Sequence, residues 1–221
     1  MGLIVRMPTI TRFRRARIAG SLLTLLACAA CSSGPPPPTG AGPSHADRVR
    51  ESRTSKDEFF RVGEDSPIPV GQRAAFTGLV YFPIDGRFNL PASLTPERSD
   101  PPVVIELATS RDRIDRLTRV GTLTFRLDDA NYTLTAFAAA ADGLNRLFVP
   151  FGDLTNRHET YGGGRYLNLT RTATGLYELD FNLAYNPYCV YDVSYECPLP
   201  PAENRLPIDI RAGERMPDNP T

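Results

Sequence analysis

After Val70 the chain alternates apolar and polar residues in short runs that are separated by turn residues. This period of two is typical of β-strands that bury one face and expose the other. The apolar positions of the expected strands are Phe76, Gly78, Val80 and Phe82; Val103, Ile105 and Leu107; Leu123, Phe125 and Leu127; Tyr132, Leu134, Ala136 and Ala138; Leu147, Val149 and Phe151; Leu167 and Leu169; Tyr177, Leu179 and Phe181; and Leu206, Ile208 and Ile210.

About eight or nine short strands with one N-terminal helix predict a mainly β fold, either an antiparallel β-sandwich or a small barrel. The alternation does not decide between the two architectures. Asp128-Asp129 lies between two of the runs and predicts a hairpin. Between residues 91 and 102 the chain holds four prolines, and we expect a surface loop there.

The residues before this β-rich region follow a different pattern. They are highly charged and have few apolar positions, and Ser44 stands where a helix N-cap is expected. We predict an exposed helix that docks at its far end through Phe59 and Phe60. The resulting division is a helix within residues 45–66, a β-rich domain over 67–215 and a tail over 216–221.

Residues 1–30 have the features of an export signal, with a basic segment ending at Arg17, an apolar run and then small residues before a cysteine. The apolar run is too short to span a bilayer comfortably as a permanent helix. Small residues before a cysteine resemble the lipobox of bacterial lipoproteins, in which that cysteine becomes the acylated N-terminus. We therefore predict a lipoprotein signal peptide, followed over residues 31–44 by a spacer rich in Pro, Ser and Gly.

Two cysteines compete for acylation. Cys28 has the better aliphatic residue three positions before it, whereas Cys31 follows two small residues and leads directly into the spacer. Acylation of Cys31 is favoured because cleavage there removes Cys28 and leaves no odd thiol; Cys28 is the alternative. No aspartate follows either cysteine, so we expect the outer membrane, facing the periplasm, as the destination.

The formal net charge of zero hides an uneven distribution. Residues 1–30 hold five of the 25 basic residues and no acidic one, so the remainder carries a net charge of about −5. This sign argues against nucleic-acid binding, which needs a basic surface. Lys56 is the one lysine of the chain. We interpret the preference for arginine as genomic base composition and give it no functional weight.

Residues 151–205 hold the triple glycine, two of the four cysteines and most of the nine tyrosines. Arg165 shares a predicted strand face with Leu167 and Leu169, so its guanidinium is expected to point inward. A buried arginine needs a carboxylate partner, and it is either a structural ion pair between strands or a group poised in a ligand pocket. The candidate partners are Asp153, Glu159 and Asp180.

Several kinds of catalytic and metal site lack their motifs. Gly162-Gly163-Gly164 opens a strand rather than a helix, which favours a backbone turn over a phosphate cradle. His158-Glu159 lacks the second histidine of a metalloprotease helix, and no Gly-x-Ser-x-Gly elbow occurs. We predict no metal and no cofactor. A hard-cation site, the open alternative, would have to use Asp153, Glu159, Asp180 and Asn182 without EF-hand spacing.

Cys189 and Cys197 bracket seven residues. In the oxidising periplasm such a pair predicts a disulfide that closes a small loop with little core of its own. Reactive or metal-binding thiols are the alternative, although two ligands by themselves do not make a zinc site.

Four motifs follow one another in the order GDLTNRHETYGGGRYLNL, LDFNLAYNPYCVY, CPLPPAENRL and RAGER, and KDEFF and FTGLVYFP precede them. Over roughly residues 55–215 the chain resembles the bacterial domain-of-unknown-function family 1684. The resemblance implies no activity, because the family has none established, and it implies export, because members are often exported or lipoprotein-like. One departure is Asn156-Arg157, where Thr-Ser-Gly is more usual, and we expect a looser turn there.

We therefore expect a lipid-anchored envelope protein whose β domain binds a small polar ligand or an envelope partner at its loop end, around residues 153–205. One alternative is a hydrolase in which Glu159 or Asp180 is the acid-base group and Arg165 stabilises negative charge. The other is a structural envelope component in which the polar residues satisfy one another. The sequence does not predict the oligomeric state. The candidate binding or catalytic residues are Asp153, Glu159, Tyr161, Arg165, Asp180, Asn182, Asn186 and Arg205.

Overall fold

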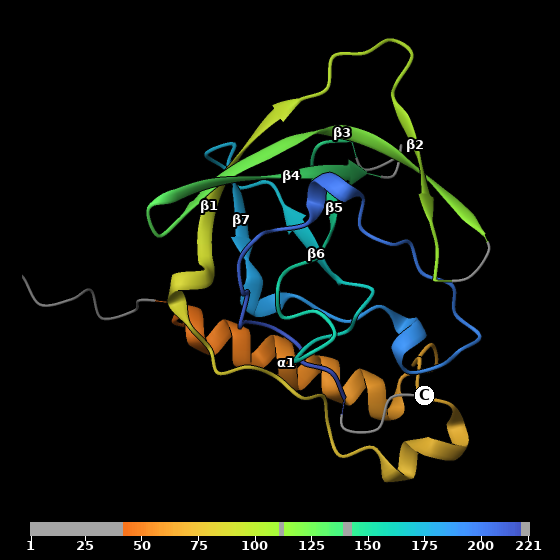
Figure 1. Cartoon of the computed structure of the whole chain (residues 1–221). Helices are drawn as coiled ribbons and strands as arrows, with labels where there is room; N and C mark the ends of the chain where they lie inside the picture. Colours follow the sequence, from red (N-terminus) through yellow and green to blue (C-terminus); the bar gives the residue numbers. More distant parts are fainter. Residues whose placement is uncertain (1–41, 111–112, 139–142, 218–221) are drawn as a thin grey trace, which may run out of the picture. The chain divides into compact units, whose positions relative to one another are not determined.

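The computed structural model describes residues 42–110, 113–138 and 143–217, and within them it has one α-helix followed by strands (Figure 1). The predicted mainly β fold with an N-terminal helix is confirmed. The signal peptide and both candidate acylation sites, Cys28 and Cys31, lie outside the described residues. The elements are α1 (His45–Val62), β1 (Asn89–Pro96), β2 (Val104–Ala108), β3 (Ile114–Leu127), β4 (Ala130–Ala138), β5 (Arg146–Phe151), β6 (Arg165–Thr170) and β7 (Tyr177–Asp180).

The strands form one antiparallel sheet that nearly closes into a barrel. Its hydrogen-bonded order is β6-β5-β4-β3-β1-β7, and β2 pairs with β3 outside this path. Arg171, directly after β6, forms a bridge with Tyr177 at the start of β7, so the two edges of the sheet meet. Closure leaves few unpaired strand edges. Of the two predicted architectures, the barrel is therefore the one found.

The barrel interior is the main core, and the predicted alternation explains it. In β3 and β4 the alternate residues Leu123, Phe125 and Leu134 point inward and are fully or almost fully buried. The predicted hairpin at Asp128-Asp129 joins these two strands. Asp128 has a positive φ of 52°, which a short polar side chain tolerates in a tight turn.

Residues 91–96 of the segment expected as a proline-rich surface loop belong to β1, so that prediction is wrong for them, whereas residues 97–102 are an exposed loop as predicted. Pro91 pairs only toward β7, because the pairing of β1 with β3 begins at Ala92. Pro96 pairs only toward β3. A proline can occupy a strand where one side has no neighbour that needs its missing N–H. The prolines thus lie where β1 has a single partner.

Two predicted strands are extended segments without a ladder. Around Phe82 the chain forms one isolated bridge, between Tyr81 and Glu214, and Leu206 donates its N–H to Gly152 O at 2.8 Å. Phe82, Leu206 and Ile210 are nevertheless buried. The apolar alternation therefore identified buried extended chain correctly but did not distinguish single bridges from a regular strand.

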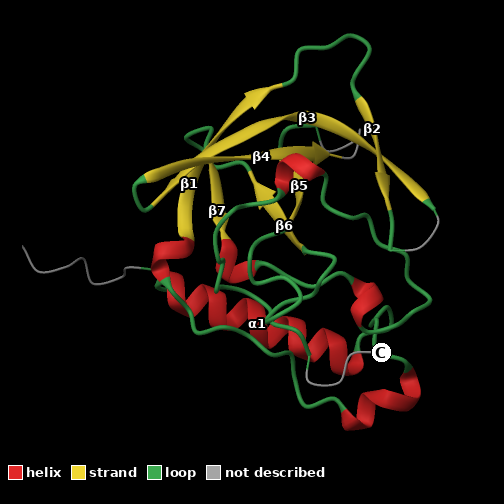
Figure 2. Ribbon diagram, viewed as in Figure 1, coloured by secondary structure: helices red, strands yellow, loops and turns green. Residues whose placement is uncertain are grey.

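Helix α1 lies against one end of the barrel (Figure 2). Ser44 caps it as predicted and forms a capping box with Asp47. Phe60 is completely buried, but Phe59 is 37% exposed, so only one member of the predicted docking pair packs inward. Phe60 contacts a second, smaller cluster that includes Ile68. Within the described residues no helix is long and apolar enough to cross a membrane.

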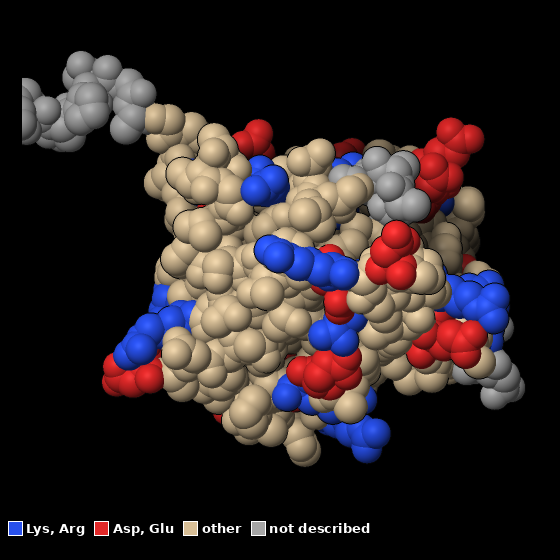
Figure 3. All heavy atoms as spheres, turned by 90° about the horizontal axis from the view of Figure 1, so that it is seen from above, with Lys and Arg blue, Asp and Glu red and all other residues tan. Residues whose placement is uncertain are grey.

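The outer surface carries charges of both signs. On the face seen from above in Figure 3, basic and acidic side chains are interspersed rather than gathered into separate patches. On the β2–β3 surface, Arg116 pairs with Glu106 at 2.9 Å, and both side chains are more than half exposed. Such pairs contribute little to stability, so this surface is a solvated one.

Candidate functional site

Arg165, the first residue of β6, points into the molecule and is completely buried. Its guanidinium forms an ion pair with Asp153, with 2.8 Å between Nη2 and Oδ2. The remaining hydrogen bonds go to backbone carbonyls of alternate residues in the C-terminal segment, namely Ile210, Ala212 and Glu214. Burial lowers the pKa of Arg165 from its ordinary value, while the Asp153 carboxylate acts in the opposite direction.

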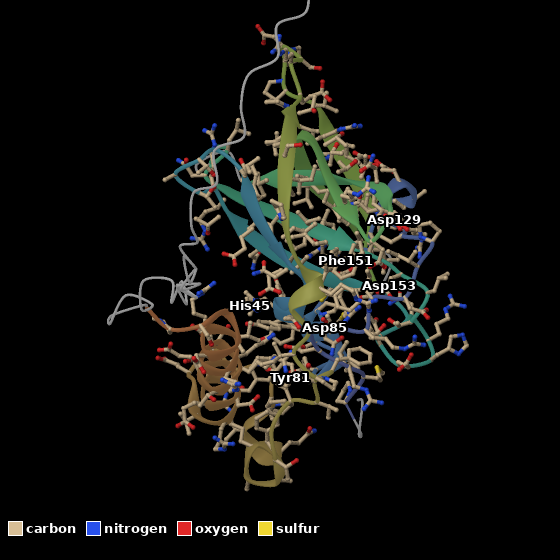
Figure 4. All side chains as sticks on the ribbon, turned by 90° about the vertical axis from the view of Figure 1, so that its left-hand side faces the viewer. His45, Tyr81, Asp85, Asp129, Phe151 and Asp153 are labelled. Atoms are coloured by element: carbon tan, nitrogen blue, oxygen red, sulfur yellow. The ribbon has the colours of Figure 1, made fainter. Side chains whose placement is uncertain are left out.

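Asp153 has no exposed side-chain surface, and its carboxylate is used by its neighbours. It accepts hydrogen bonds from Arg165, from the hydroxyl and N–H of Thr155, and from the N–H of Ile210. Figure 4 labels Asp153 beside Phe151, at the end of β5. Arg165 and Asp153 thus hold the C-terminal segment against the barrel, which is the structural ion pair of the two predicted alternatives.

The turn between β5 and β6 is held firmly. The Asn156 side chain donates to Thr160 Oγ1 at 2.9 Å and accepts from Asp153 N at 2.8 Å. The looser turn expected here is therefore absent, because the asparagine amide supplies the hydrogen bonds. Gly164 has a φ of 90°, and a Cβ there would lie 2.6 Å from Phe151 O. Gly164, the last of the three glycines, is therefore required by the backbone.

The other predicted acidic candidates lie apart from Arg165. Glu159 pairs with Arg211 at 2.8 Å on the surface. Asp180 accepts from His45 Nε2 at 2.8 Å and from the N–H and side chain of Asn182. In the described ranges no three His, Cys, Asp or Glu side chains form a group that could hold a metal ion. Of the residues considered for a cation site, Asp180 and Asn182 contact each other, whereas Asp153 and Glu159 pair with Arg165 and Arg211.

The predicted amide candidates have structural partners. Asn182 is completely buried and exchanges hydrogen bonds with the backbone of Asp85. Asn186 is also completely buried, and it donates from its backbone to Glu214 and from its side chain to Arg215 O. Arg205 is exposed, and its backbone forms a bridge with Gly152.

Asn204, which the sequence interpretation passed over, is completely buried beside β4. Its side chain accepts from Thr135 N at 2.6 Å and donates to Thr135 O and Pro150 O. Within the described residues, β4 and β5 pair with each other only through Phe137 and Phe148. The amide of Asn204 therefore replaces strand hydrogen bonds where β4 and β5 diverge.

A second carboxylate that the sequence did not single out is Glu214, whose side chain is 1% exposed. It accepts from Lys56 Nζ, from Asn186 N at 2.8 Å and from Tyr191 Oη at 3.1 Å. Lys56, the one lysine of the chain, comes from α1 and connects the helix to the C-terminal segment. Lys56, to which the sequence analysis gave no functional weight, therefore has a specific structural role.

The same lysine reaches a cleft of about 680 Å³ between α1, the outer face of β6 and the segment 183–198. Five aromatic side chains contribute to its walls, and Ser52 and Lys56 close it on the helix side. Clefts of 300 to 1,000 Å³ with apolar walls and a few polar groups are the usual form of small-molecule sites. The aromatic wall residues are Phe148, Tyr166, Tyr185, Tyr188 and Tyr195. We call this the tyrosine cleft.

The rings of the tyrosine cleft hold one another in place. Tyr166 packs edge-on against Phe148 and Tyr185, with centroids 4.9 and 5.7 Å apart, and Tyr188 packs edge-on against Tyr195 at 5.4 Å. Tyr166 Oη donates to Pro198 O, at 2.6 Å. Burial raises the pKa of Tyr185 to about 12, so its hydroxyl is neutral at physiological pH. The cleft is therefore lined by aromatic rings that hold one another in place, and Tyr185 presents a neutral phenol to it.

Charged groups at the tyrosine cleft are already paired. Lys56 binds Glu214 and lies 4.5 Å from the centroid of the Tyr185 ring. Glu196 accepts from Thr109 Oγ1 at 2.7 Å and lies 3.5 Å from Arg113 Nε. Lys56 and Glu196 therefore bring no unpaired charge to the cleft. The cleft offers a ligand hydrogen-bonding groups and aromatic ring faces.

The two cysteines of the C-terminal half lie at the edge of this cleft. Both are free thiols in the structure, so the predicted disulfide is not formed in it. Instead, the backbone N of Cys189 donates to Cys197 Sγ at 3.3 Å. Tyr161 Oη lies 3.9 Å from Cys189 Sγ, and burial is the main cause that raises the pKa of Tyr161 to about 12.

The residues of the tyrosine cleft were missed because the predicted site was built from charged groups. Seven of the nine tyrosines fall between residues 151 and 205, and this enrichment was the available signal. The alternation that sends Arg165 inward also sends Tyr166 and Asn168 outward. The contribution of α1 had no local signal, since Lys56 meets the cleft only through tertiary packing.

Comparison with known proteins agrees with the motif-based resemblance. A solution NMR structure of the uncharacterized protein from gene locus rrnAC0354 of Haloarcula marismortui is 42% identical to this chain, with a TM-score of 0.60. The match covers 76% of this chain and 92% of that one. No curated protein matches the chain. The family model described as "Protein of unknown function (DUF1684)" matches residues 74–215, which is more than half of the sequence. The chain therefore belongs to the DUF1684 family.

Proposed function

We propose that this protein binds a small, neutral, polar ligand with an apolar ring face in the tyrosine cleft, as part of a lipid-anchored cell-envelope protein. The observation that carries the binding proposal is the cleft itself, about 680 Å³ in volume and walled by mutually packed tyrosines. Rigid aromatic walls bind ligands at low entropic cost, because few side-chain rotamers are lost on binding. The anchoring proposal rests on the sequence of residues 1–31.

The chemistry of the wall favours a neutral ligand. Lys56 and Glu196 each have a charged partner in the protein, so an ionic ligand would have to compete with an existing ion pair. Asn168 Nδ2 donates to Tyr185 Oη at 2.9 Å, and both side chains line the cleft. Ring faces together with hydroxyl and amide groups suit a sugar-like molecule, which has apolar ring faces and many hydroxyl groups.

Binding of methyl glycosides and disaccharides to the full chain, measured by calorimetry, tests this proposal. Tyr188→Ala should weaken the binding of any positive compound about tenfold or more, because stacking on one aromatic side chain contributes about 1–3 kcal/mol. Tyr132→Ala is the matched control, since Tyr132 belongs to β4 and packs on Phe125 away from the cleft. Absence of binding by the whole panel, or equal weakening by the two variants, would contradict the proposal.

The anchor is tested separately by mass spectrometry of the protein purified from cell membranes. We expect a mature N-terminus at an acylated Cys31, and Cys31→Ser should leave the precursor uncut. Cys28→Ser should be processed normally, because Cys28 belongs to the removed segment. An acylated Cys28 would favour the alternative site, and an unmodified, uncut N-terminus would refute the lipoprotein prediction.

The hydrolase alternative has less support. It requires Arg165 to meet substrate, but this side chain is completely buried and its hydrogen bonds go to Asp153 and to backbone carbonyls. Glu159 lies on the surface and pairs with Arg211. Glu159, a predicted acid-base group, therefore pairs with Arg211, whereas Arg165, the predicted charge stabiliser, pairs with Asp153. We do not propose catalysis by these residues.

A further inference from the structure

We propose that Cys189 and Cys197 are a redox-active dithiol whose reversible closure to a disulfide changes the shape of the tyrosine cleft. This goes beyond ligand binding and does not depend on it, because it concerns the chemistry of the two sulfur atoms. Three observations support it: the proximity of the thiols, their unequal exposure, and their position beside the walls of the cleft.

The two thiols are close and differently placed. The backbone N of Cys189 donates to Cys197 Sγ at 3.3 Å, which brings the two residues into direct contact. Cys189 is half-buried, whereas Cys197 is 7% exposed. In thiol-disulfide exchange the accessible thiolate attacks first, and the less accessible thiol then resolves the mixed disulfide. Cys189 is therefore the attacking residue and Cys197 the resolving one.

The surroundings favour a thiolate at Cys189. Hydrogen bonding from Cys197, with further contributions from Ser110 and Tyr161, lowers the pKa of Cys189 to about 6. The titratable groups that face the two thiols are Tyr161, Tyr166 and Tyr185. The same hydrogen bond raises the pKa of Cys197, so the pair keeps one proton between the two sulfurs near neutral pH. A thiolate next to a protonated thiol is suited to nucleophilic attack.

The chemistry balances with a low-molecular-weight disulfide as oxidant. The Cys189 thiolate attacks one sulfur of the oxidant, its S–S bond breaks, and one thiol leaves. Cys197 then attacks Cys189 Sγ and releases the second thiol. In total the protein dithiol loses two protons and two electrons and forms one S–S bond, while the oxidant is reduced to two thiols.

The link to the cleft is the loop between the two cysteines. Tyr188 precedes Cys189 directly, Tyr195 lies two residues before Cys197, and both tyrosines line the cleft. Cys197 is itself a lining residue, and its carbonyl accepts from Ser110 N at 2.9 Å, which fixes this end of the loop to the end of β2. Drawing the sulfurs into a covalent bond must therefore shift the loop at the Cys189 end, where Tyr188 and its partner Tyr195 meet.

Glutathione disulfide tests the proposal on the full chain. Because Cys28 and Cys31 are also present in that chain, modified residues are assigned by peptide mass spectrometry. In the wild type we expect a Cys189–Cys197 bridge that dithiothreitol reverses. Cys197→Ser should instead retain one glutathione on Cys189, because no resolving thiol remains, and Cys189→Ser should gain far less adduct at Cys197.

Three outcomes overturn the proposal. The first is absence of the bridge in the wild type, and the second is equal adduct formation in the two serine variants. The third is a bridge that leaves the amide NMR signals of Tyr188 and Tyr195 unchanged between the reduced and oxidised full chain, because the dithiol would then not affect the cleft. Alkylation by iodoacetamide is a further control. The alkylation rate of Cys189 should be half-maximal near pH 6, a pH dependence that a purely structural cysteine pair would not show.

Discussion

The two faces of β6 use polar residues in opposite ways. Arg165 points inward, is completely buried and has protein partners for its charge, whereas its neighbour Tyr166 points to the other face and lines a cleft. A buried charge must be paired, so the inner face is fixed by the ion pair of Arg165 with Asp153. The outer face carries neutral rings and amides beside an open volume. Richness in chemically versatile residues therefore does not by itself indicate a site.

The largest expected effect comes from breaking the inner face. Arg165→Met leaves the buried Asp153 carboxylate unpaired and frees three backbone carbonyls. We expect the free energy of unfolding to fall by about 3–5 kcal/mol, measured by urea denaturation. The matched control is Arg211→Met, which removes a partly exposed pair with Glu159 and should leave the free energy of unfolding nearly unchanged. Equal losses would show that Arg165 is not the structural clamp.

An intermediate effect is expected for Asn204→Ala. The change leaves the buried N–H and C=O of Thr135 without their side-chain partner, which should cost about 1–3 kcal/mol in the free energy of unfolding. Asn168→Ala is the control. Asn168 is exposed on the outer face of β6, so removing its side-chain amide should lower the free energy of unfolding by less than about 0.5 kcal/mol. A reversed order of the two losses would contradict the assignment of the two faces.

A smaller effect, specific to the tyrosine cleft, appears at high pH. Burial raises the pKa of Tyr185 to about 12, so between about pH 10 and 12 the unfolded chain releases this proton while the folded protein keeps it. Stability from this group is complete below about pH 10 and is lost as the pH rises through 12, with a slope of at most about 1.4 kcal/mol per pH unit. Tyr185→Phe should therefore flatten the alkaline fall in unfolding free energy. An unchanged slope would mean that this phenol is not buried.

The sequence predicted the features that follow from alternation. A mainly β fold, the Asp128-Asp129 hairpin and the inward Arg165 with a carboxylate partner all follow from which residues share a strand face. Strand β1 was missed because prolines were assumed to exclude strand pairing. Its two prolines, Pro91 and Pro96, each lie where β1 has only one neighbouring strand.

The tyrosine cleft could not be predicted, because its walls come from α1, β6 and the segment 183–198, which only tertiary packing brings together. Lys56 shows this limit most clearly. That Lys56 is the one lysine of the chain was visible in the sequence. Its ion pair with Glu214 was not, because Glu214 lies 158 positions further along the chain.

The central claim is that ligands bind at the outer face of β6, in the tyrosine cleft, and not at the polar residues around Arg165. The most direct test is a two-dimensional NMR titration of the full chain with the methyl glycosides and disaccharides, following backbone amide signals. The account predicts shifts concentrated at Lys56, Tyr166, Asn168 and residues 185–198. Shifts concentrated at residues 153–165 and 210–214, or an unchanged spectrum with every compound, would contradict it.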